Sequence, residues 1–214
     1  MAEINNARVW FVVVVIYLVG LAGFLVPALR ELFIWLIPFN ILFAFGVLLW
    51  GGQKAGAAKK LLLFSVCFLF GYFYELAGTK TGIIFGQYAY GNGLGPKVWD
   101  VPVLIGLNWF FMVYTSLALS AAVSKNTYIR LFLAPALMVA YDFFLEPFAM
   151  AHDMWHWAGN AVPLQNYLAW YAGGLFLCAV ALGGRFGTGN RFAPGLFVVQ
   201  FCFFVILYLA GRWG

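Results

Sequence analysis

Long apolar runs that follow one another along the chain constrain this sequence more than any other feature. Each is close to the roughly 20 residues that a helix needs to cross the hydrocarbon of a bilayer. We identify such runs at residues 9–26, 32–50, 61–77, 101–123, 129–150, 166–183 and 193–211. They lack the alternating pattern of barrel strands. The sequence therefore predicts an all-α polytopic membrane protein, with about seven transmembrane helices in one bundle that forms a single integral membrane domain over residues 1–214.

The composition excludes a soluble globular protein. Of the 214 residues, 65% are hydrophobic and 9% are charged, whereas soluble domains have roughly half apolar and a quarter charged residues. A net charge of +5 would suggest a nucleic-acid partner in a soluble protein, but here the basic residues fall between the apolar runs and orient the helices. We therefore expect membrane lipid, and no nucleic acid, as a partner.

The basic residues divide unequally when the predicted loops are assigned alternately to two sides of a membrane. One side receives Arg8, Lys54, Lys59, Lys60, Lys125, Arg130, Arg185 and Arg191. The other side receives Arg30, Lys80, Lys97 and Arg212. Because basic loops favour the cytoplasm, we expect a protein of the cytoplasmic (inner) membrane with its amino terminus in the cytoplasm and its carboxyl terminus outside.

Three acidic residues interrupt the apolar runs. Glu75, Asp142 and Glu146 lie toward the same, non-cytoplasmic side, and Asp142 and Glu146 share a helix face because they are four positions apart. A carboxylate at the centre of a membrane helix costs about 2.5–3.5 kcal/mol, so each needs a partner or a task. We expect the three to line one interior pocket, where desolvation and mutual repulsion favour one protonated carboxyl, a usable general acid. Alternatively, the three carboxyls have no catalytic role and are simply hydrated or paired with neighbouring hydroxyl and amide groups.

Two loops on that side combine glycines with aromatic and amide side chains, at residues 78–99 and 152–165. In both, Gly-Asn is followed by Val-Pro and then by an asparagine beside an aromatic residue, which suggests a repeat of two helix–loop–helix units around one site. Membrane-interface belts of Trp and Tyr would also explain the aromatic residues. The candidate substrate-binding residues are Tyr72, Thr79, Tyr88, Tyr90, Asn108, Trp109, Trp155, Trp157 and Asn166.

The histidines offer little for a metal site. His152 and His156, the two histidines of the chain, stand four apart with Asp153 between them, a spacing that could bind a metal on a helix. Membrane di-iron hydroxylases and desaturases use many more histidines. No Gly-rich phosphate loop, nucleophile elbow or paired aspartate-rich prenyl-diphosphate motif is present. We therefore expect neither a metal nor an organic cofactor.

Two ordered blocks of residues resemble the carotenoid biosynthesis family typified by the CruF-type carotenoid hydratases. The first block reads ELAGTKTG at residues 75–82, then FGQY at 85–88, LGP at 94–96 and VP at 101–102. The second reads DFFLEP at residues 142–147, then WHW at 155–157 and PLQNYLAW at 163–170. The match covers about residues 70–171; Glu146 and Ala169 depart from the family pattern, which has Asp and Gly there in many members.

This resemblance implies a cofactor-independent hydro-lyase. Such an enzyme adds water across the terminal double bond of an acyclic carotenoid end group and gives a tertiary alcohol, so its partners are an acyclic carotenoid or similar polyene, and water. Two alternatives remain open. A carotenoid or isoprenoid cyclase would capture the same cation with a neighbouring alkene, and a polyene-binding or transport protein would perform no reaction.

The chemistry assigns roles to the three carboxyls. An alkene accepts water only after an acid protonates its less substituted carbon. Asp142 is the expected proton donor because it lies a turn deeper than Glu146, where desolvation holds its proton most firmly. Glu146 and Glu75 would orient the water or accept its proton, assisted by Asn108 and Tyr72.

The charge distribution predicts the orientation of the loops. A single cysteine in loop 78–99, in a background that lacks Cys67, Cys178 and Cys202, should react with an impermeant reagent only from outside the cytoplasmic membrane. A cysteine in the loop that holds Arg185 is the control and should react only from the cytoplasmic side. Cytoplasmic labelling of loop 78–99 would reverse the orientation.

Overall fold

The computed structural model describes residues 2–51, 56–186 and 189–211. Seven helices in these residues are long and apolar enough to cross a membrane, which confirms the predicted all-α polytopic membrane protein. Their bounds are α1 Ala2–Leu25, α2 Arg30–Gly51, α3 Ala57–Thr81, α4 Leu104–Val123, α5 Thr127–Ala151, α6 Leu164–Gly183 and α7 Ala193–Ala210.

The helix ends follow local signals in the sequence. Asn126 caps α5, because its side chain accepts hydrogen bonds from the backbone N–H groups of Tyr128 and Ile129. Gly82, with a φ of 66°, ends α3 in the left-handed conformation that glycine tolerates best. The third helix is longer than the predicted 61–77, so that Lys59, Lys60 and Lys80 lie within its ends rather than in loops.

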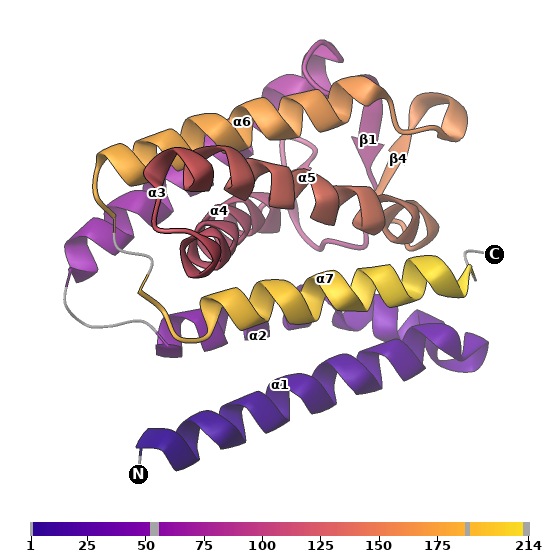
Figure 1. Ribbon diagram of the computed structural model, residues 1–214. Coiled ribbons are helices and arrows are strands. Elements are labelled where there is room, and N and C mark those ends of the chain that lie inside the picture. Colours follow the sequence, from indigo (N-terminus) through magenta and orange to yellow (C-terminus); the bar gives the residue numbers. More distant parts are fainter. Residues whose placement is uncertain (1, 52–55, 187–188, 212–214) are drawn as a thin grey trace.

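Helix α4 forms the centre of the bundle. It is the most buried of the seven helices, and it packs against α3, α5 and α7. Helices α5 and α6 form a second closely packed pair, whereas α1 and α2 lie on one side of the bundle with α7 between α1 and the rest (Figure 1). Side chains from α4 therefore reach most of the interior.

The two ends of the bundle differ in their connections. The strand end, as we call it, carries the strands β1 Tyr88–Tyr90 and β4 Trp155–Trp157 and the carboxyl end of α7. The opposite, basic end carries the link α4–α5, the amino ends of α1, α3 and α7 and the carboxyl ends of α2 and α6 (Figure 1). Described basic residues of the basic end are Arg8, Lys59, Lys60, Lys125, Arg130, Arg185 and Arg191. Those of the strand end are Arg30, Lys80 and Lys97, and Lys54 and Arg212 lie outside the described residues. The described basic residues thus lie at the two ends of the bundle as expected when successive loops are assigned to alternate sides of a membrane.

The loops of the strand end contain short strands that we did not predict. Strands β1 and β4 pair antiparallel, with Tyr88 opposite Trp157 and Tyr90 opposite Trp155. We call this pair the aromatic ribbon. A second hairpin, β2 Lys97–Val98 with β3 Val101–Pro102, occupies the start of the predicted fourth run, so α4 begins at Leu104 and not at 101. The ribbon joins the two loops that we interpreted as parts of a repeat. The second of these loops, at residues 152–164, contains no hairpin that would correspond to β2 and β3 of the first.

Small residues let α3 and α6 approach Trp109 of α4. Trp109 is fully buried, and its indole stacks on Trp170 of α6 with 4.5 Å between ring centroids. A Cβ atom at Gly71 of α3 would lie 2.3 Å from Cγ of Trp109, and one at Gly173 of α6 would lie 3.0 Å from the same indole. Trp109 thus occupies a slot that a larger residue at Gly71 would close.

We expect Gly71→Ala to destabilise the protein by about 1–3 kcal/mol, because the added methyl group overlaps Trp109. The control is Gly46→Ala in α2, where no atom lies within 4 Å of the added carbon; it should be neutral or slightly stabilising, because alanine favours helix over glycine by roughly 0.5–1 kcal/mol. Unfolding of the purified protein in detergent measures both. Equal stability of the two variants would show that Trp109 has room to move.

Candidate active site

Glu75, Asp142 and Glu146 form a buried group near the strand end, which we call the carboxyl cluster. Glu75 lies in the last third of α3, and the other two lie on one face of α5. Their exposed fractions are 3%, 1% and 1%. The three are close enough for the charge of Glu75 to act on both Asp142 and Glu146. The prediction that they converge in the interior near one end of the bundle agrees with this arrangement.

Neutral donors surround Glu75. The hydroxyls of Tyr88 and Tyr90 both donate to its Oε2, and the indole N–H of Trp109 donates to its Oε1 at 3.0 Å. Burial and the adjacent Glu75 charge raise the pKa of both tyrosines, so they stay protonated and act as donors. Three of the predicted substrate-binding residues therefore bind this carboxyl.

Glu146 has a matching set of partners. The indole N–H groups of Trp155 and Trp157 both donate to Glu146 Oε2 at 2.8 Å. The amide of Asn166, on α6, donates to Glu146 Oε1 at 3.2 Å and to Asp142 Oδ2 at 2.7 Å. Asn166 therefore bridges the two carboxyls of α5.

The aromatic ribbon brings these donors together. Alternate residues of a strand point to one face, so Tyr88 and Tyr90 of β1 reach Glu75, and Trp155 and Trp157 of β4 reach Glu146. Across the ribbon, the rings of Tyr88 and Trp157 lie 4.9 Å apart. The loops thus cover the carboxyl cluster with aromatic side chains whose polar atoms are all directed inward.

Asp142 differs from the other two carboxyls. Its Oδ2 accepts one hydrogen bond, from Asn166, and its Oδ1 is buried with no partner among the described residues. Glu75 and Glu146 each accept three hydrogen bonds. All of these donors are neutral. Asp142 is therefore the carboxyl whose ionised form receives the least support from hydrogen bonds.

Two predicted substrate-binding residues have structural contacts instead. The Tyr72 hydroxyl donates to the backbone carbonyl of Val98 at 2.6 Å and so fixes the hairpin of the first loop. The Thr79 hydroxyl donates to carbonyls of its own helix, those of Glu75 and Leu76. Neither side chain hydrogen-bonds to a side-chain oxygen of the carboxyl cluster. Asn108, near the start of α4, lies in a separate cavity described below.

The possible metal ligands do not converge. His152 is buried against the rings of Phe24 and Phe148, and its Nδ1 lies 2.7 Å from the Phe148 carbonyl oxygen; burial lowers its pKa. His156 is exposed and pairs with Asp153 at 2.8 Å. In the described parts of the chain, no three His, Cys, Asp or Glu side chains form a group that could hold a metal ion.

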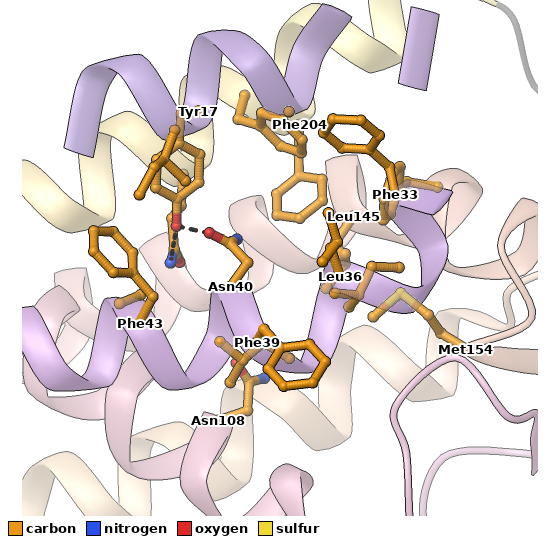
Figure 2. A pocket seen from close by; sticks show the side chains of 18 of the residues that line it. Tyr17, Phe33, Leu36, Phe39, Asn40, Phe43, Asn108, Leu145, Met154 and Phe204 are labelled. Carbon is orange, nitrogen blue, oxygen red and sulfur yellow. Dashed lines mark hydrogen bonds between the residues drawn. The ribbon is translucent and has the colours of Figure 1, made fainter. Parts of the chain in front are cut away.

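A cavity of about 430 Å³ lies against the face of α5 that carries Tyr141 and Leu145, next to the face that carries Asp142 and Glu146. Its walls come mainly from α1, α2, α4, α5 and α7, and they are largely aromatic and aliphatic (Figure 2). Of the predicted site residues, Asn108 and Trp155 line it. The carboxyls do not line this cavity, and the expectation that they line one pocket open to lipid and to water stays a prediction. They lie behind the cavity wall because their side chains are bound by the ribbon and Asn166.

Trp155 connects the two regions. This residue forms part of the cavity wall, while its indole N–H donates to Glu146. Leu145 and Tyr141 also line the cavity, each immediately before a carboxyl residue in the sequence. One helix, α5, thus presents an apolar face to the cavity and an acidic face to α6.

Four polar residues that sequence reasoning missed meet inside this cavity. Gln200 donates to the Tyr17 hydroxyl at 2.7 Å, and Tyr141 donates to Gln200 at 3.1 Å. Asn40 donates to Tyr17 at 3.5 Å, and Figure 2 shows these two side chains directed toward each other. We call these four residues the neutral cluster. The sequence does contain a sign of this cluster. Asn40 and Gln200 lie in the middle of apolar runs, and polar groups at membrane depth need hydrogen-bonding partners.

Comparison with known proteins gives one curated relative and one family. A bisanhydrobacterioruberin hydratase of Haloarcula japonica is 32% identical over 130 residues, which are 57% of this chain and 43% of that protein. The chain thus spans less than half the length of this relative. No solved structure matches. Residues 33–212 match the family model described as carotenoid biosynthesis protein, so the chain belongs to the carotenoid biosynthesis protein family.

Proposed function

We propose that the protein is a carotenoid hydratase, which adds water across the terminal C=C bond of an acyclic carotenoid end group to give a tertiary alcohol. The family and the hydratase relative support a role in carotenoid modification. The observation that carries the proposal is the carboxyl cluster: three acids buried in an apolar bundle, with neutral partners only among the described residues.

The first step is protonation of the alkene. A carboxyl group transfers its proton to the less substituted carbon, the electron pair of the π bond forms the new C–H bond, and a tertiary cation remains. General acids of this kind contribute about 10²–10⁴-fold to a rate. Aromatic faces stabilise a cation by roughly 0.5–2 kcal/mol, and Trp155 offers one in the cavity wall.

Asp142 is the proposed proton donor. Hydrogen bonds to a carboxylate favour its ionised form, and Glu75 and Glu146 each accept three of them, whereas Asp142 accepts one. The unpartnered Oδ1 of Asp142 is the atom that would carry the proton. Its burial makes an ionised group there costly, which favours the neutral acid.

The second step is capture of the cation by water. A water oxygen donates a lone pair to the tertiary carbon, and the excess proton passes to a carboxylate of the cluster; a later proton transfer from that group to Asp142, which lost its proton in the first step, regenerates the acid. Glu146 is the proposed acceptor because Asn166 already links it to Asp142. The addition is redox-neutral, and the proposal needs no cofactor.

Substrate access involves Trp155. The proposal places the end group of the polyene in the cavity, where Trp155 lies between it and Glu146. Proton transfer requires contact between acid and alkene. The Trp155 indole must therefore shift to open the carboxyl cluster, in which Asn166 joins Asp142 to Glu146, and we infer that this shift replaces the Trp155 hydrogen bond to Glu146 with one to water or to a neighbouring group.

The location of the protein is part of the proposal. We place it in the cytoplasmic (inner) membrane as a single integral domain, with the basic end in the cytoplasm and the strand end outside. Seven of the ten described Lys and Arg residues lie at the basic end, which supports this orientation. Water would then reach the carboxyl cluster from the outer interface.

Incubation of the purified protein with an acyclic carotenoid in heavy-oxygen water tests the reaction. We expect a tertiary alcohol that carries one labelled oxygen, identified by mass spectrometry. An isomer of unchanged mass would instead establish cyclisation, and bound but unchanged pigment would support a binding or transport role.

Substitution tests the acid. We expect Asp142→Asn to lower turnover at least about a hundredfold, because the amide cannot supply the proton, with pigment binding largely retained. Asp100→Asn is the matched control: Asp100 is exposed at the strand end and pairs with Lys80, so turnover should remain unchanged. Full activity of Asp142→Asn would exclude Asp142 as the acid, and full activity of Glu146→Gln and Glu75→Gln as well would exclude the whole cluster.

A further inference from the structure

A second pocket lies at the strand end, where Tyr88 and Trp157 pair across the aromatic ribbon. Its volume is about 480 Å³, and its walls come from the end of α3, the turn that follows α3, and the strands β1 and β4. We call it the polar pocket. Apart from the ribbon aromatics, its polar side chains are those of Thr79, Lys80, Thr81, Gln87 and His156.

The polar pocket offers hydrogen bonds while its charges are already paired. Nζ of Lys80 lies 2.7 Å from an Asp100 carboxylate oxygen, and Nε2 of His156 lies 2.8 Å from an Asp153 carboxylate oxygen. An anion would have to compete with these carboxylates, whereas water can bond to the hydroxyl, amide and ammonium groups as they stand. The lining therefore suits water better than an anion.

Two ribbon residues lie between the polar pocket and the carboxyl cluster. Tyr88 and Trp157 both line the pocket, and their ring centroids are 4.9 Å apart. The Tyr88 hydroxyl donates to Oε2 of Glu75, and the Trp157 indole N–H donates to Oε2 of Glu146. The pocket is thus one side chain away from each buried glutamate.

The apolar cavity approaches the carboxyl cluster at the other end of the ribbon. Trp155 lines that cavity, whereas Tyr88 and Trp157 line the polar pocket, and the two spaces have no lining residue in common. Val19 and Phe39 of the cavity lining are 52% and 66% exposed, on a surface that faces lipid in a membrane. A hydrocarbon and water therefore have separate approaches to the same carboxyls.

We propose that the polar pocket is the water entrance of this protein, and that Tyr88 and Trp157 close its inner end. Water gathers in the pocket and passes to the carboxyl cluster when the ribbon is displaced, while a polyene approaches from the apolar cavity past Trp155. This inference deepens the proposed function, on which it rests for the use of that water as the reactant of hydration. The route itself does not depend on any reaction.

A thiol at position 75 measures the access of water-soluble molecules to the carboxyl cluster. Glu75→Cys is made in the full-length chain without Cys67, Cys178 and Cys202, and the protein in lipid nanodiscs is treated with a small, charged methanethiosulfonate, which lipid excludes. Mass spectrometry gives the rate of modification. Ala89→Trp fills the polar pocket, because Ala89 lines it and is exposed. The matched control is Ala151→Trp, at the exposed last residue of α5, which lines neither space.

We expect Ala89→Trp to slow the modification at position 75 severalfold and Ala151→Trp to leave its rate unchanged. In the chain that retains Glu75, Ala89→Trp should also lower the yield of labelled alcohol from heavy-oxygen water. Pigment binding should be retained, because the polyene enters elsewhere, and this retention shows that the variant is folded.

Three outcomes would overturn the water entrance: a thiol at position 75 that does not react without either tryptophan, equal rates in the two tryptophan variants, or an undiminished yield of alcohol in Ala89→Trp. A wild type that forms no labelled alcohol, together with modification that Ala89→Trp slows, would instead overturn the hydratase and leave the route in place.

Discussion

The cost of burying three carboxyl groups in an apolar bundle determines much of this structure. Each must be satisfied without water, and the described partners are indoles, phenols and one amide rather than cations. Such donors hold a carboxyl in either protonation state, whereas a lysine or arginine would hold it ionised. A bundle that is to carry a transferable proton needs the first kind of partner.

The loops at the strand end supply most of those donors. A two-stranded ribbon places two aromatic side chains of each strand on one face, where they reach two carboxyls that come from different helices, α3 and α5. Glycine allows the first loop to pack tightly on the second: a Cβ atom at Gly91 would lie 2.2 Å from the Asp153 carbonyl oxygen. Asp153 in turn accepts a hydrogen bond from the backbone of Asn92 and from His156, and the His156 contact lowers its pKa most.

Much of the fold could be predicted because the length and hydropathy of an apolar run are enough to identify a membrane helix. The buried acids were also visible, since Asp142 and Glu146 interrupt an apolar run. The ribbon was not, because three-residue strands are too short to show alternation. The cavity was missed for another reason: it depends on which faces of α1, α2 and α7 meet, and these helices are apolar all round. Asn40 and Gln200 were the only local sign of it, and their pairing with Tyr17 is a tertiary property.

The pairing of β1 with β4 joins the two halves of the covering layer into a single unit. Tyr90 is bound to Glu75 and Trp155 to Glu146, and the two aromatic residues are also partners across the ribbon. Displacing one strand alone would break the backbone pairing that holds the other, so the covers of the two glutamates are mechanically coupled. In the proposed hydration, the water that captures the cation would then reach both glutamates together, when the whole ribbon is displaced, rather than one glutamate at a time.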